Sequence, residues 1–330
     1  MDKRALLAGD TRALARAISA IEESRPGAGP LIQELWGERP PGAPAAQVVG
    51  VTGPPGSGKS TLVDALTQLW REAGRRVAVL AVDPNSPFSG GAILGDRVRM
   101  QRHALDSGVF IRSMGARGHL GGVALATRGA VRLLDALGWE MVVVETVGVG
   151  QSELEVCEIA DSVVVVITPA AGDGVQVIKA GITEVADLFA VNKADLPGAE
   201  RVLRELRDLV RRPRQAEGWR VPVLETVAVR GAAGAQALAE ALAAHRHYLA
   251  GSGQDRERAR HRVRDQVVEL VGARAAEFAR RELAATADLL PGDPRQADPE
   301  RAAEVILGRL GRQGSKMKAP GRDPAARSRR

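Results

Sequence analysis

The feature that most constrains the fold is an eight-residue stretch, GPPGSGKS, from Gly53 to Ser60. A short apolar run precedes it, and leucines at helical spacing follow it. A strand, a glycine-rich loop and a helix in this order form a cradle for phosphate groups. The glycines let backbone N–H groups converge, and the helix adds the positive end of its dipole. The alternative is a glycine-rich turn without a ligand, which the fit at all eight positions and both flanks disfavours.

Two side chains of this loop carry the expected chemistry. Lys59 can reach the outer phosphates of a nucleotide, and the Ser60 hydroxyl can ligate Mg²⁺. The residues predicted to contact the nucleotide here are Gly53, Pro54, Pro55, Gly56, Ser57, Gly58, Lys59, Ser60 and Thr61.

Apolar runs alternate with helical stretches from Gln47 to about Leu249. Most of these runs are continuous rather than alternating, which indicates that both faces of the sheet are covered. The sequence therefore predicts an α/β fold with a mostly parallel sheet wrapped by helices, and ligands beyond the carboxyl ends of the strands. The expected strands are Gln47–Thr52, Val77–Val82, Val109–Ile111, Met141–Val147, Val163–Thr168, Leu188–Asn192 and Val221–Ala228.

Helical segments flank this central domain on both sides. Residues 1–23 are predicted as one amphipathic helix, and a helical arm follows the last strand. The arm is expected to run from Gln254 to Leu290 and, after a Pro-Gly break, to about Leu310. Its apolar faces need cover, either from residues 1–36 or from a second subunit. The predicted division is 1–46 for the N-terminal extension and linker, 47–250 for the nucleotide domain, 251–311 for the arm and 312–330 for a basic tail.

The charge and composition narrow the class of protein. The formal net charge is +6, but the tail from Arg312 to Arg330 holds seven basic residues and one acid, so it accounts for the whole excess. We therefore expect no nucleic-acid partner, and the tail is predicted to be disordered. There is a single cysteine, Cys157, no signal peptide and no apolar stretch of membrane-spanning length. These features predict a soluble cytoplasmic protein without a membrane partner.

A second motif, NKAD, follows a predicted strand about 130 residues after the loop and supplies Asn192, Lys193 and Asp195. The Asp195 carboxylate can accept hydrogen bonds from the guanine ring N–H and the exocyclic amino group. Adenine lacks this donor pair, so the carboxylate would stay unpaired, at a cost of about a hundredfold or more in affinity. Alone the motif could be an ordinary turn between a strand and a helix. Residues Thr226, Val227 and Ala228, at the last strand end, are candidates to close over the base.

Three acids near other strand ends are candidates for the Mg²⁺ site: Asp83, Asp96 and Glu145. A triphosphate with Mg²⁺ needs hard oxygen ligands, so Ser60 and these acids form the predicted metal set. The alternative is that a single acid only caps a helix, which applies most to Asp96. The sequence ETVG resembles the DxxG turn of GTPases, which places Glu145 on the metal side and leaves Gly148 free to turn toward the γ-phosphate. The predicted catalytic residues are Lys59, Asp83, Glu145 and Gly148.

The remaining candidates are less specific. Lys179 lies in a glycine-bearing loop that runs into a helix, where it could contact nucleotide, switch residues or a partner, or remain solvated. The five histidines form no metal-binding pattern, and no Ser-His-Asp arrangement is evident. His245 and His247 are expected on different sides of one helix.

Together these motifs are similar to the MeaB/ArgK family of P-loop GTPases, the G-protein chaperones of adenosylcobalamin-dependent acyl-CoA mutases. The resemblance runs from LLAGDTRALARAI through GPPGSGKSTL, AVDPNSPFSGGAILGDRVRM, RGHLGG, ETVGVGQSE, GDGVQVIKAGITEVAD and NKAD to the helical arm. It implies a SIMIBI-like P-loop fold, GTP or GDP with Mg²⁺, and a homodimer held partly by the C-terminal helices. It also implies gated delivery of cofactor to a mutase of the methylmalonyl-CoA mutase type, and protection of that mutase.

Two other functions stay open. Members of this family have carried labels as ATP-dependent kinases linked to arginine and ornithine transport, against which NKAD argues. A nucleotide-stabilised scaffold without useful hydrolysis is the non-enzyme alternative. The chain lacks a D-x-H-x-x-G cobalamin signature, so the cobalamin domain is expected on the partner.

Overall fold

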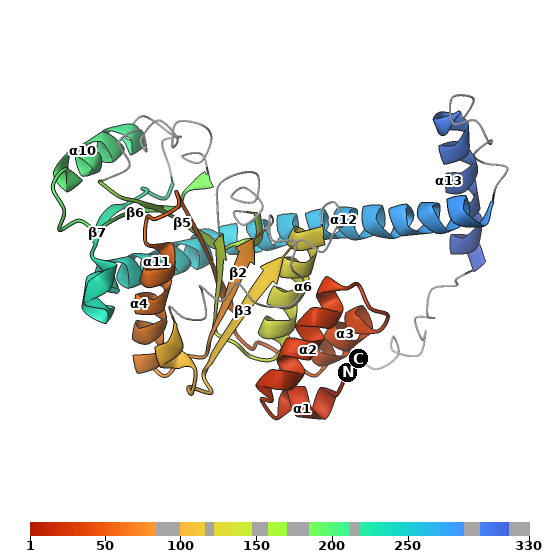
Figure 1. Ribbon diagram of the computed structural model, residues 1–330, viewed down its shortest axis with the longest axis horizontal. Helices are drawn as coiled ribbons and strands as arrows, with labels where there is room; N and C mark the ends of the chain where they lie inside the picture. The colour runs from red at the N-terminus through yellow and green to blue at the C-terminus, as the bar shows by residue number, and fades with distance from the viewer. Residues whose placement is uncertain are drawn as a thin grey trace, which may run out of the picture. The chain divides into compact units, whose positions relative to one another are not determined.

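The computed structural model describes residues 1–83, 100–115, 122–146, 158–169, 185–211, 218–286 and 298–316. It holds one seven-stranded sheet in the order β3-β2-β4-β1-β5-β6-β7, with every recorded strand pair parallel (Figure 1). The predicted α/β fold is thus confirmed. The strands are β1 (Gln47–Thr52), β2 (Val77–Asp83), β3 (Val109–Gly115), β4 (Met141–Thr146), β5 (Ser162–Ile167), β6 (Leu188–Asn192) and β7 (Val223–Thr226).

The strand that leads into the glycine-rich loop lies at the centre of the sheet. All six residues of β1 are buried, and β1 pairs with β4 on one side and β5 on the other. Its continuous apolar sequence fits this position, because each face is covered by helices. Since all the pairs are parallel, the carboxyl ends of the strands meet at one edge, and each predicted motif that follows a strand is delivered there.

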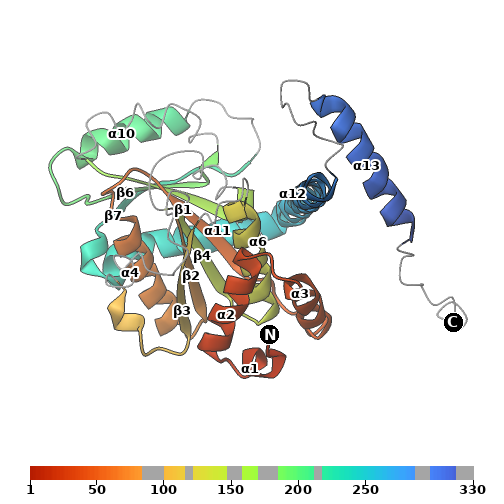
Figure 2. The ribbon, with the colours of Figure 1, turned by 45° about the vertical axis from the view of Figure 1, so that its right-hand side comes forward.

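Helices cover both faces of the sheet (Figures 1 and 2). Apolar residues of α4 and α11 form one core layer with the sheet, and those of α6, α10 and the N-terminal helices form the other. The elements of these layers are α1 (Lys3–Leu7), α2 (Thr11–Glu22), α3 (Ala28–Gly37), α4 (Lys59–Glu72), α6 (Gly122–Ala136), α10 (Ala199–Val210) and α11 (Ala232–Ser252), with short 3₁₀ helices η1 (Gln101–His103) and η2 (Ala228–Arg230).

The single helix predicted over residues 1–23 is wrong, because the chain forms two. Gly9 has a φ of 81°, in the left-handed region where a helix ends. Asp10 then caps α2, since its carboxylate accepts hydrogen bonds from Arg12 N at 2.7 Å and Ala13 N at 3.1 Å. The amphipathic pattern continues across the break, which is why periodicity alone does not reveal it.

The N-terminal helices belong to the same core as the sheet. Leu14, Ile18 and Leu35 are buried in the layer that α6 also lines. On the edge strand β3, Arg112 donates to Ser19 Oγ at 2.9 Å and to Glu22 Oε2 at 2.8 Å. These contacts attach α2 to the edge strand β3.

Two compact units divide the chain, Met1–Arg262 and Val263–Arg330. The long helix α12 (Gln254–Ala285) supplies the start of the second unit, and α13 (Pro299–Lys316) follows. Within that unit, Arg309 of α13 binds Glu282 at 2.6 Å and Thr286 at 3.1 Å. Helix α13 extends beyond the predicted end near Leu310, so residues 312–316 of the predicted disordered tail are helical. Arg, Gln and Lys are good helix formers, which favours this continuation despite Gly311 and Gly314.

Candidate functional site

The glycine-rich loop depends on backbone conformations that favour glycine. Gly53, Gly56 and Gly58 have φ values of 140°, 74° and 87°, which other residues rarely adopt. Gly53 also packs against the neighbouring strand β5, because a Cβ there would lie 2.1 Å from the carbonyl oxygen of Val166. The loop therefore turns tightly out of β1 and directly into α4.

The Lys59 ammonium group is held within the loop. Its Nζ donates to the carbonyl oxygens of Gly53 at 2.7 Å and Pro54 at 3.2 Å, and the residue is only 7% exposed. Burial among carbonyl dipoles keeps the positive charge at the turn that would receive phosphate groups.

Two of the predicted metal ligands are in direct contact. The Ser60 hydroxyl donates to Glu145 Oε1 at 2.6 Å, and Glu145 is 2% exposed at the end of β4. Asp83 ends the adjacent strand β2, where Ala81 pairs with Glu145. A hydroxyl and two carboxylates are hard oxygen donors of the kind that Mg²⁺ prefers, so the residues present fit the ion. In the part of the chain that the structure describes, no group of three or more His, Cys, Asp or Glu side chains forms a ready-made metal site.

The NKAD motif touches the glycine-rich loop. Asn192 Nδ2 donates to Ser57 O at 2.8 Å, and Lys193 Nζ donates to Gly56 O at 3.0 Å. A Cβ on Gly58 would lie 2.3 Å from Asn192 Nδ2, so the contact requires glycine there as well. Lys193 has a φ of 57°, a left-handed conformation that is uncommon for a non-glycine residue. The loop and the motif thus form one rim, although 135 residues separate their bonded members.

The turn after β7 completes this rim from the other side. Asn192 Oδ1 accepts a hydrogen bond from Ala228 N at 3.1 Å and lies 3.4 Å from Thr226 Oγ1. Ala194 N donates to Thr226 O at 3.1 Å. Asn192 therefore connects the glycine-rich loop, from here on called the phosphate loop (Gly53–Ser60), with residues 226–228. Asp195, two residues after Lys193, is exposed and makes no hydrogen bond or ion pair with any residue that the structure describes.

Three predicted site residues, Asp96, Gly148 and Lys179, lie outside the described residues. The same holds for Cys157.

A buried Ser-His-Asp contact is present that the sequence did not suggest. His245 Nδ1 lies 2.8 Å from Ser162 Oγ, and its Nε2 lies 3.4 Å from Asp187 Oδ1. Ser162 and His245 are both 0% exposed, so no substrate can reach the hydroxyl. Burial lowers the pKa of His245 below its usual value, which favours the neutral ring. We interpret the group as a structural polar cluster. The helical spacing predicted that His245 and His247 lie on different sides of α11, and the structure buries His245 and exposes His247.

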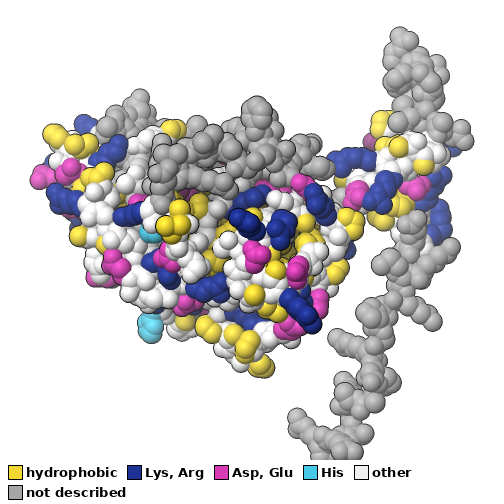
Figure 3. All heavy atoms as spheres, turned by 60° about the horizontal axis from the view of Figure 1, so that its bottom comes forward, with side chains coloured by type: hydrophobic (Ala, Val, Ile, Leu, Met, Phe, Trp, Pro, Cys, Tyr) yellow, Lys and Arg dark blue, Asp and Glu magenta, His cyan; other side chains and the backbone are white. Residues whose placement is uncertain are grey.

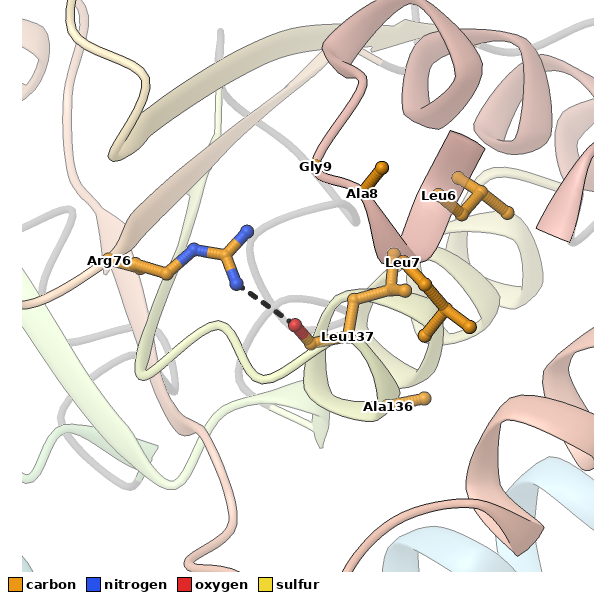
Figure 4. A pocket seen from close by; sticks show the side chains of 7 residues that line it. All are labelled: Leu6, Leu7, Ala8, Gly9, Arg76, Ala136 and Leu137. Carbon is orange, nitrogen blue, oxygen red and sulfur yellow. Dashed lines mark hydrogen bonds between the residues drawn. The ribbon is translucent and has the colours of Figure 1, made fainter. Parts of the chain in front are cut away.

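A cavity of about 310 Å³ lies away from this rim (Figure 4). Arg76 points toward it from the residue before β2, so it lies near the amino ends of the strands, opposite the glycine-rich loop. Arg76 Nη1 donates to Leu137 O at 3.0 Å. The lining residues are Leu6, Leu7, Ala8, Gly9, Arg76, Ala136 and Leu137. The cavity contains none of the predicted site residues.

The parallel sheet and the loop between β1 and α4 define the class: this is a P-loop nucleoside-triphosphatase fold. Residues 14–283 match the family described as "Methylmalonyl Co-A mutase-associated GTPase MeaB". The chain belongs to this MeaB family, which confirms the resemblance read from its motifs.

Two relatives and one solved structure are similar to this chain over much of its length. A putative GTPase of Pyrococcus horikoshii is 43% identical over 306 residues, covering 92% of this chain and 95% of its own. The methylmalonic aciduria type A homolog, mitochondrial, of Mus musculus is 35% identical, covering 76% of this chain and 63% of its own. A solved structure described as a LAO/AO transport system kinase aligns with a TM-score of 0.65 at 26% identity, over 94% of this chain and 96% of that one.

In the described portions, no helix combines the length and apolar character needed to cross a membrane.

Proposed function

We propose that this protein is a Mg²⁺-dependent GTPase that hydrolyses GTP to GDP and phosphate. In this proposal it is a G-protein chaperone for an adenosylcobalamin-dependent acyl-CoA mutase of the methylmalonyl-CoA mutase type. Its nucleotide state gates cofactor loading and protects the mutase. The observation that carries the nucleotide assignment is the position of Asn192, which bonds both the phosphate loop at Ser57 and the 226–228 turn at Ala228.

Guanine selectivity is assigned to Asp195. The carboxylate is exposed at this rim without a described protein partner, so it is available to accept the two guanine donors. ATP offers no such pair, and the unpaired carboxylate would disfavour it by about a hundredfold.

The phosphate side is assigned to the loop from Gly53 to Thr61. Lys59 is the cation that would neutralise the outer phosphates, and exchange of its carbonyl partners for phosphate oxygens is the change expected on binding. Ser60, Asp83 and Glu145, with Asp96, would hold Mg²⁺, which supplies charge neutralisation. The segment from Glu145 to Gly148 is assigned to positioning the attacking water.

Competition binding tests the nucleotide assignment. A fluorescent GDP analogue is displaced with unlabelled GTP or ATP, and GTP is expected to compete at about a hundredfold lower concentration. Lys59→Ala should lose tight binding of the analogue, whereas Lys3→Ala, which removes a lysine paired with Glu34, should not. Displacement by ATP at concentrations equal to GTP would contradict the assignment.

The mutase partner rests on the family and on the name of the mouse relative. Slow intrinsic hydrolysis is expected to accelerate when the cognate mutase is added. A pulldown from native extract, with and without a non-hydrolysable GTP analogue, should capture that mutase in a nucleotide-dependent way. Unchanged turnover and no nucleotide-dependent capture would contradict the partnership. A cytoplasmic location and a homodimer are parts of the same proposal.

The second candidate is an ATP-dependent kinase linked to amino-acid transport, favoured by the description of the aligned solved structure. The same competition experiment separates the two, since a kinase would prefer ATP. Transfer of labelled phosphate from ATP to a protein acceptor would support it directly.

A further inference from the structure

The peptide group between Val227 and Ala228 is fixed on two sides. Its N–H, on Ala228, donates to Asn192 Oδ1 at 3.1 Å. Its carbonyl oxygen, on Val227, accepts from Arg230 N at 2.8 Å, and Val227 N donates to Gly234 O at 3.1 Å. Because a peptide group is planar, its carbonyl and its N–H cannot move independently.

Gly234, in the first turn of α11, packs directly against that carbonyl. A Cβ at this position would lie 1.9 Å from Val227 O and 2.7 Å from Val227 C. Gly234 is not among the glycines with positive φ, so an alanine could adopt its backbone conformation. What the position requires is therefore space, and the neighbouring atoms belong to the backbone and cannot rotate away.

We propose that Gly234 is a positioning residue for guanine selectivity, an inference that rests on the proposed guanine site. A side chain at 234 would push the Val227 carbonyl, turn the peptide plane and withdraw the Ala228 N–H from Asn192. Asn192 would lose a partner that aligns it and the following Asp195 with the phosphate loop. Gly234 touches no nucleotide in this account, since it acts through the 226–228 turn.

The test compares two glycine-to-alanine changes in the same helix. Gly234→Ala introduces the clash, and Gly251→Ala adds the same methyl group where no atom lies within 4 Å. Displacement of N-methylanthraniloyl-GDP by GDP and by ADP gives the selectivity of each protein. Gly234→Ala is expected to weaken GDP binding by about tenfold while ADP binding changes by less than about twofold, because the phosphate loop is untouched. Gly251→Ala should match the wild type.

Each outcome decides something. Equal loss of GDP and ADP affinity, or wild-type selectivity in Gly234→Ala, overturns the proposal. A wild-type protein that does not prefer GDP overturns the proposed function itself, and the two failures are thus distinguishable.

A second variant covers the case in which Gly234→Ala does not fold. Ala228→Pro removes the N–H that Asn192 Oδ1 accepts and leaves Gly234 in place. It should lower the preference for GDP over ADP by about tenfold, and an unchanged preference would overturn the proposal.

Discussion

Individual residues in the phosphate loop meet two requirements at once, conformation and space. Gly53 has both a φ of 140° and a backbone oxygen 2.1 Å from its missing Cβ. Gly56 has a positive φ but no atom within 4 Å, so only its conformation restricts substitution. At the residue scale, substitution of Gly53 is therefore restricted more than substitution of Gly56, because the backbone that follows β1 also approaches β5 closely there.

Gly53→Ala should lower the free energy of unfolding by about 3 kcal/mol, from backbone strain and overpacking against Val166. Urea denaturation measures this directly. Gly37→Ala, where nothing lies within 4 Å, is the matched control and should change the stability by less than about 1 kcal/mol. Equal urea midpoints for the two variants would show that the packing of Gly53 against β5 tolerates the added methyl group.

His245 predicts how stability depends on pH. Its folded-state pKa lies below the ordinary value of 6.5, chiefly because of burial, so the unfolded chain binds the proton more readily. This contribution is fully present above pH 6.5 and is lost as the pH falls below it. The wild type should lose up to about 1.4 kcal/mol between pH 7.5 and 5.5 from this residue.

The measurement is the free energy of unfolding at both pH values for three proteins. His245→Gln should show a smaller loss on acidification than the wild type, since glutamine does not titrate. His247→Gln, at an exposed position of the same helix, should retain the wild-type loss. The same loss in all three proteins would rule out His245 as its source.

At the element scale, α2 is attached to the edge strand β3 and packs against α6. The Arg112 and Glu22 side chains are 11% and 3% exposed, so their ion pair is largely shielded from water. Ile21 of α2 also packs close to Gly129 of α6. A Cβ added at Gly129 would lie 2.7 Å from the Cγ2 methyl group of Ile21. The helix is therefore held by charge on one side and by close packing on the other.

Arg112→Met should lower the free energy of unfolding by about 3 kcal/mol, because it removes the guanidinium of a largely buried ion pair and keeps the Glu22 carboxylate, which is only 3% exposed. Arg201→Met is the control, since Arg201 pairs with Glu205 at the surface and should contribute less than about 1 kcal/mol. Chemical denaturation of both variants gives the comparison. A loss of similar size in both variants would show that the Arg112–Glu22 pair does not stabilise the packing of α2 on the sheet.

At the scale of the whole molecule, the second unit carries an apolar stripe. Val263, Val267 and Val271 recur every four residues on α12, and each is more than half exposed. Such a stripe is typical of a helix that packs against another subunit. On the face drawn in Figure 3, basic side chains are interspersed with acidic ones.

The proposed homodimer predicts that Val267→Asp shifts the protein to a monomer, because it places a charge within the apolar stripe. The mass of one chain is 34.8 kDa. Light scattering after gel filtration should give twice this mass for the wild type and the mass of one chain for the variant. Ala276→Asp adds the same charge on the opposite side of α12 and should stay dimeric. A monomeric wild type would contradict the proposal.

The fold class and the main site segments could be predicted from the sequence because their signals are local. The continuous run at Gln47–Thr52 indicates a strand covered on both faces, and the glycines after it indicate a turn with positive φ. NKAD could be placed at a strand end in the same way. Since parallel strands share one carboxyl edge, the sequence also predicted that this motif and the loop would lie on one rim.

What only the tertiary structure decided are the contacts between residues far apart in the chain. The bond from Asn192 to Ser57, the space that Gly234 leaves for Val227 and the burial of His245 against Ser162 depend on how helices pack on the sheet. Periodicity reports which face of an element is apolar, but it carries no information about which distant atom that face will meet. The sequence by itself therefore predicted the parallel sheet and the segments that carry the candidate site, and packing decided which residues hold those segments in place.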